Sequence, residues 1–89
     1  IQALRALTYQ MAARYDDGED IRVEAGLIKL TSMDWGARCL DHGIQIHGAM
    51  GESLELPLTL FYRYLRHGQI GGGTSEIQRI QIARKLLKD

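Results

Sequence analysis

Residues 21–44 read IRVEAGLIKLTSMDWGARCLDHGI, and this stretch decides the fold. Apolar residues recur along it at intervals of three and four, which is the spacing of one face of an α-helix. A helix of this length spans about 36 Å. Gly26 and Gly36 lie inside it, each costing roughly 1 kcal/mol relative to alanine. We therefore expect close helix–helix approach along this segment. The stripe consists of Val23, Leu27, Leu30, Met33, Ala37, Leu40 and Ile44.

Shorter periodic segments lie on both sides of this long helix. A first helix is predicted over about residues 1–15, with one face formed by Leu4, Leu7 and Met11. The acidic, glycine-containing residues 16–20 should end it as a solvated turn. Further along, Pro57 suits the first turn of another helix. That helix carries Leu60, Phe61, Tyr64 and Leu65.

A last helix is predicted from about Ser75 to Leu87, and basic side chains complement the dipole at its C-terminal end. Its inward residues should be Ile77, Ile80, Ala83 and Leu87. No stretch alternates with the period of two that a half-buried strand requires. The sequence therefore predicts an all-α, up-and-down bundle of about four helices.

Composition sets limits on domain number and partners. The 89 residues are enough for one domain, and a formal net charge of zero argues against a nucleic-acid partner. No apolar run is long enough to cross a membrane, so membrane insertion is not expected. Cys39 is the only cysteine, which fits a reducing compartment such as the cytoplasm. The chain starts on a helical pattern at Ile1 without a capping residue. We therefore expect residues 1–89 to be a single domain cut from a longer protein.

Two glycine-rich segments are the candidate ligand sites. In Gln69–Arg79, three consecutive glycines at 71–73 permit positive φ and close approach of another molecule. Ser75 can then act as a helix N-cap, with Gln78 closing a capping box. Glu76 in the first turn would compete with an anion, so this loop suits a neutral polar group better. The upstream segment, Gln45–Gly51, should form a second loop of the same kind. A purely structural capping role is the alternative for both segments.

Other groups of polar residues give weaker signals. His42 and His47 are five residues apart, which puts them on different helix faces, and no metal site is expected. Arg63, Arg66 and His67 could bind a phosphate or form a solvated helix face. No arrangement of nucleophile, base and acid is recognisable.

Three motifs in this chain resemble the C-terminal helical domain of the acyl-CoA dehydrogenase family. Gly73–Arg79 with Ile82-Ala83-Arg84 is similar to the family's C-terminal signature. Gln45–Gly51 is similar to its upstream glutamine–glycine motif. The third motif is Glu55–Leu58 followed by Tyr62-Arg63, similar to the family's proline-containing helix entry. The spacing between the motifs is also that of the family, and the resemblance covers essentially the whole chain.

The resemblance implies an FAD enzyme that oxidises an acyl-CoA thioester to the 2,3-enoyl-CoA and passes electrons to an electron-transfer flavoprotein. It implies a homodimer or tetramer with FAD at a subunit interface, in the mitochondrial matrix if the source is eukaryotic. Gly73 would approach the acyl thioester as the substrate-binding residue. The residues implied to contact FAD are Gln45, Ile46, His47, Gly48 and Ala49, from the neighbouring subunit, and Thr74, Ser75 and Glu76.

This chain departs from the family pattern at several positions. Gly72 stands where many members have the catalytic glutamate, so no catalytic residue is assigned and the base is expected upstream of residue 1. Leu60 and Tyr64 replace a frequent Arg and Asp, which suggests packing in place of a polar pair. Ala49 stands where a second glycine is common. The fragment alone should be inactive. A flavin oxygenase or oxidase on the same scaffold, or a non-catalytic subunit of a mixed complex, are the alternatives.

Overall fold

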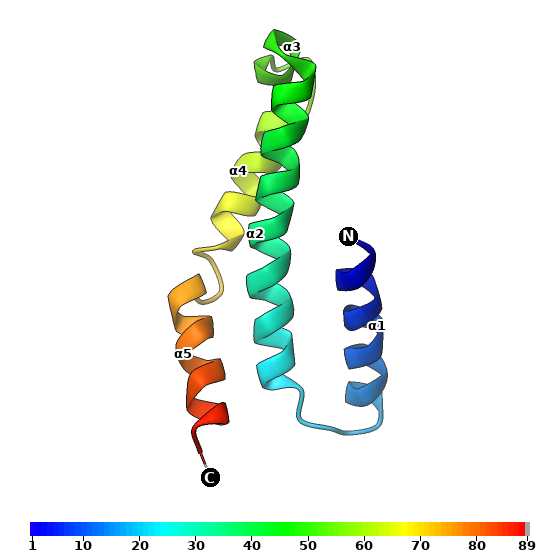
Figure 1. The fold of residues 1–89 in the computed structure, drawn as a ribbon, viewed down its shortest axis with the longest axis vertical. Helices are drawn as coiled ribbons and strands as arrows, with labels where there is room; N and C mark the ends of the chain where they lie inside the picture. The colour runs from blue at the N-terminus through cyan, green and yellow to red at the C-terminus, as the bar shows by residue number, and fades with distance from the viewer. Residues whose placement is uncertain (89) are drawn as a thin grey trace. The chain divides into compact units, whose positions relative to one another are not determined.

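The computed structural model describes residues 1–88, and every regular element among them is an α-helix (Figure 1). The predicted all-α class, with four substantial helices, is confirmed. Contacts divide the chain into two compact units. The first contains residues 1–32 and the described residues from 75 onward, and the second contains residues 33–74. The helices are α1 (Gln2–Asp16), α2 (Arg22–His47), α3 (Ala49–Glu52), α4 (Leu58–Gly68) and α5 (Ser75–Leu86).

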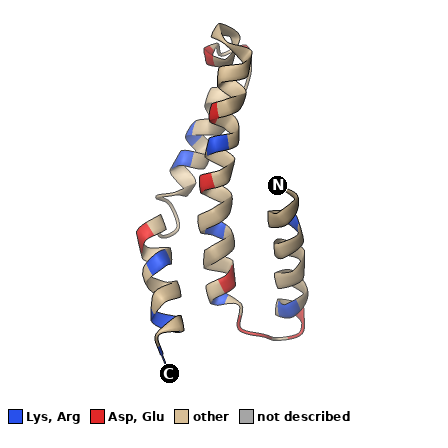
Figure 2. Ribbon diagram, in the orientation of Figure 1, with Lys and Arg blue, Asp and Glu red and all other residues tan. Residues whose placement is uncertain are grey.

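In the first unit, α1 packs on the beginning of α2. Met11 is buried, and Leu4 and Leu7 are half-buried, as the periodicity predicts. Arg14 in the last turn of α1 also links the two helices: its Nε lies 2.7 Å from Glu19 and its Nη1 lies 3.2 Å from Glu24. The hydrogen bond that Arg14 donates to the Glu19 carboxylate is the largest cause of the raised pKa of Arg14. The acidic turn at 16–20, which is largely red in Figure 2, is exposed as expected. Glu19 and Asp20 in this turn form ion pairs.

The packing face of α5 differs from the prediction. Ile77, Ile80, Ala83 and Leu87 are exposed in this chain, whereas Ser75, Gln78 and Ile82 are half-buried. Gly26 of α2 explains the difference. A Cβ built on Gly26 would lie only 2.8 Å from Oε1 of Gln78, so this glycine provides the space that the Gln78 side chain fills. The expected close approach at Gly26 is therefore present, but it selects the Gln78 face of α5.

In the second unit, α4 runs antiparallel to α2, and small residues of each helix face large ones of the other. Cβ atoms built on two α2 glycines would lie 2.8 Å from Cδ1 of Leu65, at Gly36, and 3.9 Å from Cδ2 of Leu58, at Gly43. Gly68 of α4 in turn leaves space that Met33 fills. Ala37, between the two α2 glycines, is one of the most buried residues of the chain. The glycines therefore let α4 pack closely on α2.

Leu60 and Tyr64 do not pack within this unit. They are 62% and 75% exposed, so the expectation that they replace a polar pair by packing is wrong for the described residues. The half-buried face of α4 is Leu58, Thr59, Tyr62 and Leu65. None of the helices described in residues 1–88 combines the length and apolar character needed to cross a membrane.

Candidate functional site

The segment from Gln45 to Gly51 is mostly helical, which corrects the predicted loop. Helix α2 continues through His47, Gly48 interrupts the helical backbone at φ +58°, and α3 starts at Ala49. Gly48 therefore ends the helix as predicted, whereas Gly51 lies inside α3 and does not. Nδ1 of His47 lies 2.7 Å from the carbonyl oxygen of Gly43, and only a protonated Nδ1 can donate to that oxygen. The neutral ring then leaves Nε2 as an acceptor.

The predicted cofactor-binding residues of this segment are all solvent-accessible. Gln45, Ile46, His47, Gly48 and Ala49 are exposed, and a Cβ built on Gly48 would meet no atom within 4 Å. This open space can admit a ligand close to the backbone.

Gly51 has the opposite environment. It is buried, and a Cβ atom there would overlap the carbonyl oxygen of Ile44 and lie 2.9 Å from its Cα. Because these are backbone atoms, they cannot move aside as a flexible side chain could. The absence of a side chain at Gly51 therefore lets α3 pack tightly against α2.

The downstream glycine segment forms the predicted turn. Gly72 and Gly73 have φ values of +65° and +93°, a region that favours glycine. Gly71 has a different reason to be glycine: a Cβ atom there would lie 2.8 Å from Nε2 of His67. The carbonyl oxygen of His67 also accepts hydrogen bonds from the backbone N–H groups of Ile70 and Gly71, both at 2.8 Å. These contacts join the end of α4 to the glycine turn.

The helix that follows starts one residue earlier than the predicted cap requires. Ser75 is the first residue of α5, so Thr74 occupies the N-cap position. The predicted capping box of Ser75 and Gln78 is therefore out of register by one residue, and the Gln78 side chain lies at Gly26. Glu76 is in the first turn, as predicted, and its carboxylate lies 3.8 Å from Nη1 of Arg79.

Within the second unit, the two segments predicted to bind ligands lie apart. Gln69, which precedes the glycine turn, donates from Nε2 to the carbonyl oxygen of Met33 at 3.5 Å. Gln45 is twelve residues further along α2, a distance of about 18 Å along the helix. The segment at Gln45 and the turn at Gly73 thus lie at opposite ends of the second unit. Ser75 and Glu76 belong to the first unit.

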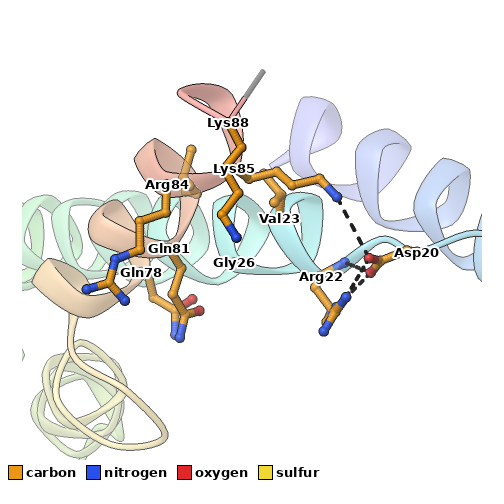
Figure 3. Close-up of a pocket in the computed structure, with 10 residues that line it drawn as sticks. Asp20, Arg22, Val23, Gly26, Gln78, Gln81, Arg84, Lys85 and Lys88 are labelled. Carbon is orange, nitrogen blue, oxygen red and sulfur yellow. Dashed lines mark hydrogen bonds and ion pairs between the residues drawn. The ribbon is translucent and has the colours of Figure 1, made fainter.

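A groove of about 300 Å³ in the first unit was missed by the sequence reasoning (Figure 3). Val23 and Ile82 contribute apolar surface, and basic side chains from α5 and the start of α2 line it. The carboxylate of Asp20 faces two of these bases, at 2.8 Å from Nη2 of Arg22 and 4.0 Å from Nζ of Lys85. Hydrogen bonds from the side chain and backbone of Arg22 hold the pKa of Asp20 well below its usual range. The lining residues are Asp20, Arg22, Val23, Gly26, Gln78, Gln81, Ile82, Arg84, Lys85 and Lys88.

The basic cluster predicted on α4 is divided in the structure. Arg66 lines a second groove, of about 350 Å³, between α2 and α4, together with Asp34, Arg38 and Asp41. Two bases and two acids balance in that groove, and Nε of Arg38 pairs with Asp34 at 3.2 Å. His67 instead turns toward Gly71. A phosphate site formed by this cluster is therefore not supported. Within residues 1–88, no group of three or more His, Cys, Asp or Glu could hold a metal ion.

These observations define an all-α domain with an open glycine junction at the end of α2 and a glycine turn before α5. The chain belongs to the acyl-CoA dehydrogenase family: residues 1–87 match the family model described as "Acyl-CoA dehydrogenase, C-terminal domain".

Curated relatives match across the whole chain. It is 36% identical over 90 residues to the (R)-benzylsuccinyl-CoA dehydrogenase of Thauera aromatica, covering 100% of this chain and 22% of the relative. It is 35% identical over 89 residues to the cyclohexane-1-carbonyl-CoA dehydrogenase of Geobacter metallireducens, covering 100% and 23%. The mitochondrial short-chain specific acyl-CoA dehydrogenase of Rattus norvegicus is 35% identical over 88 residues, with coverage of 99% and 21%.

The chain thus spans less than a quarter of the length of these relatives. A solved structure reported as "Electron transferring flavoprotein of Acidaminococcus fermentans: Towards a mechanism of flavin-based electron bifurcation" contains a chain of similar fold. The TM-score is 0.92 at 28% identity, and the match covers 99% of this chain and 23% of that one.

Proposed function

We propose that this chain is the C-terminal domain of an FAD-dependent acyl-CoA dehydrogenase that oxidises an acyl-CoA thioester to the 2,3-enoyl-CoA. The observation that carries the proposal is the family match over residues 1–87, together with 35–36% identity to dehydrogenases named for CoA thioesters. Those names include a short-chain acyl group, a ring carboxylate and benzylsuccinate, so the family membership leaves the acyl group of this protein open.

The residues at the end of α2 are suited to hold FAD. The exposed amide of Gln45 can donate and accept hydrogen bonds, and the open space beside Gly48 admits a ligand against the backbone. His47 is oriented by its bond to Gly43, with Nε2 left to meet the ligand. Ile46 and Ala49, both exposed, would complete this contact.

The turn before α5 would contact both the flavin and the substrate. Thr74, Ser75 and Glu76 would contact FAD, and Gly73, with positive φ and no side chain, would let the backbone approach the acyl thioester. When bound, the flavin would accept the hydride from the substrate β-carbon. Glycine at position 72 has no group that accepts a proton, and we propose that the catalytic base lies upstream of residue 1.

The separation of the two segments supports an oligomer. Gln45 lies about 18 Å along α2 from Met33, which Gln69 contacts, and we propose that the two segments contact different flavins. This fits a dimer or tetramer in which residues 45–49 contact the flavin of a neighbouring subunit. An electron-transfer flavoprotein is the proposed electron acceptor, in the cytoplasm or, for a eukaryotic source, the mitochondrial matrix.

The direct test uses the complete protein that carries this chain. We expect it to purify with FAD and to reduce an artificial dye only when an acyl-CoA is added. A panel covering straight-chain, branched, cyclic and dicarboxylic thioesters is needed because the acyl group is open. Bound FAD without dye reduction by any member would favour a non-catalytic subunit. Oxygen consumption with formation of a hydroxylated product would favour an oxygenase, and a protein that binds no flavin would contradict the proposal.

A further inference from the structure

The imidazole of His67 occupies the space that a side chain on Gly71 would take. A Cβ atom on Gly71 would lie 2.8 Å from Nε2, 3.3 Å from Cε1 and 3.4 Å from Cδ2 of His67. The part of the ring nearest the glycine turn is therefore its polar Nε2 edge. Any larger residue at position 71 would displace this ring.

Backbone hydrogen bonds anchor the residue that carries this ring. The carbonyl oxygen of His67 accepts hydrogen bonds from Ile70 and Gly71, which hold the last turn of α4 against the start of the glycine turn. The backbone of His67 is therefore anchored close to the glycine turn, and its side chain reaches Gly71. His47 differs, because its Nδ1 already bonds to a helix carbonyl.

The ring nitrogens of His67 are available to a ligand. The side chain is exposed, and neither nitrogen has a hydrogen-bond partner within residues 1–88. A ligand that covers this exposed imidazole removes its water, so a ligand that can hydrogen-bond to the ring is favoured, because a polar group that loses water without gaining a partner costs free energy. The adjacent Gly72 contributes no side chain that could cover this edge.

We propose that His67 lines the acyl site and favours acyl-CoA thioesters that carry a second oxygen function on the acyl chain, such as a carboxylate. This inference rests on the proposed function, since it takes the glycine turn to face the acyl group. The imidazole N–H donates to the additional oxygen. A plain alkyl chain of the same length leaves that donor unpaired, and sites of this kind reject such analogues.

The test compares two matched substrates in the complete flavoprotein. Glutaryl-CoA and pentanoyl-CoA have five acyl carbons each and differ in the terminal carboxylate. We expect wild type to favour the glutaryl thioester in kcat/KM, and His67→Leu to reduce the preference about tenfold, the value of one hydrogen bond. His67→Gln, which keeps a donor, should retain part of it. His42→Leu, an exposed histidine of α2, is the matched control and should leave the preference unchanged.

Binding and geometry provide readouts besides turnover. The dissociation constants of the two thioesters should change in parallel with the kcat/KM ratio, and glutaryl-CoA should shift the imidazole NMR signals of His67. Gly71→Ala should lower the preference in wild type, because it displaces the ring, and have little effect in the His67→Leu background. If His67→Leu fails to fold, His67→Gln and Gly71→Ala in the wild-type protein still test the inference.

A wild-type preference for pentanoyl-CoA, or an unchanged preference in His67→Leu, would overturn the inference. So would equal effects of Gly71→Ala in both backgrounds. Absence of flavin, or of turnover with every acyl-CoA, would instead be a failure of the proposed function. The two failures can therefore be told apart.

Discussion

At the residue scale, glycines that lie close together in the sequence have different roles. Gly48 ends α2 through a positive φ and has open space around it, whereas Gly51 sits in α3 against the backbone of Ile44. In the sequence the two are equivalent turn signals. Only the structure separates the glycine that exposes backbone to a ligand from the one that allows close packing.

Substitution of Gly51 should therefore be costly. Gly51→Ala places a methyl group against fixed backbone atoms of Ile44, so we expect about 1–3 kcal/mol of destabilisation, as for other overpacked sites. Gly43→Ala is the control. Its Cβ would make an ordinary 3.9 Å contact with Leu58 inside α2, and alanine should be neutral or gain up to about 1 kcal/mol. Thermal unfolding of the complete protein would measure both, and equal effects would contradict this account of Gly51.

The ion pair of Asp20 and Arg22 has a defined pH dependence. The pKa of Asp20 is lowered in the fold, chiefly by the hydrogen bond from the Arg22 side chain and then by its backbone N–H. The stabilisation is therefore complete above the unfolded value of about 3.9 and is lost as the pH falls through the lower folded value.

Carboxyl NMR titration of the Asp20 side chain would test this. We expect Arg22→Gln to raise the pKa of Asp20 toward its ordinary value. Arg38→Gln, which removes the partner of Asp34, should leave the Asp20 titration in place. An Asp20 midpoint that does not move in Arg22→Gln would show that the side-chain hydrogen bond is not the cause.

At the scale of elements, the sequence predicts where the helices lie better than which faces they bury. The spacing of apolar residues in α1 correctly identifies Leu4, Leu7 and Met11 because this helix has a single packing side. In α5 the same reasoning selects Ile77 and Ile80. It fails because Gly26 admits Gln78 at the contact, and hydrophobic periodicity does not register space left by a glycine on another helix.

The candidate site was likewise predictable from the sequence only in part. The positive φ at Gly72 and Gly73 and the stop at Gly48 follow from local glycine chemistry and were predictable. The extension of α2 through His47 and the short α3 were not, because they depend on the packing of Gly51 against Ile44. The contact of His67 with Gly71 also had no sequence signal, since it depends on how α4 enters the turn.

The pairing of α2 with α4 can be tested by a double-mutant cycle. Gly36→Leu should force Leu65 out of its place and destabilise the protein by about 1–3 kcal/mol. Leu65→Ala supplies space, so the double variant should recover part of the loss, with a coupling energy of at least about 0.5 kcal/mol. Chemical denaturation measures all four proteins. Strict additivity would indicate that the two residues do not share this contact.

At the scale of the whole molecule, the chain spans less than a quarter of its curated relatives. The proposed flavin contacts lie at separate places in the domain, so no single copy of residues 1–89 would enclose the cofactor. We expect residues 1–89, expressed separately, to bind FAD far more weakly than the complete protein. Equilibrium titration with FAD would measure this difference. Tight, stoichiometric binding by the fragment would contradict the distribution of contacts proposed for this domain.

The central claim is that this domain belongs to a working acyl-CoA dehydrogenase, and an anaerobic titration tests it most directly. The complete protein, purified with its flavin, is mixed with each acyl-CoA of the panel while the visible flavin absorbance is followed. The account predicts bleaching of the oxidised flavin by at least one thioester, with formation of the matching 2,3-enoyl-CoA. A flavin that stays oxidised with every thioester, or a protein without flavin, would contradict it.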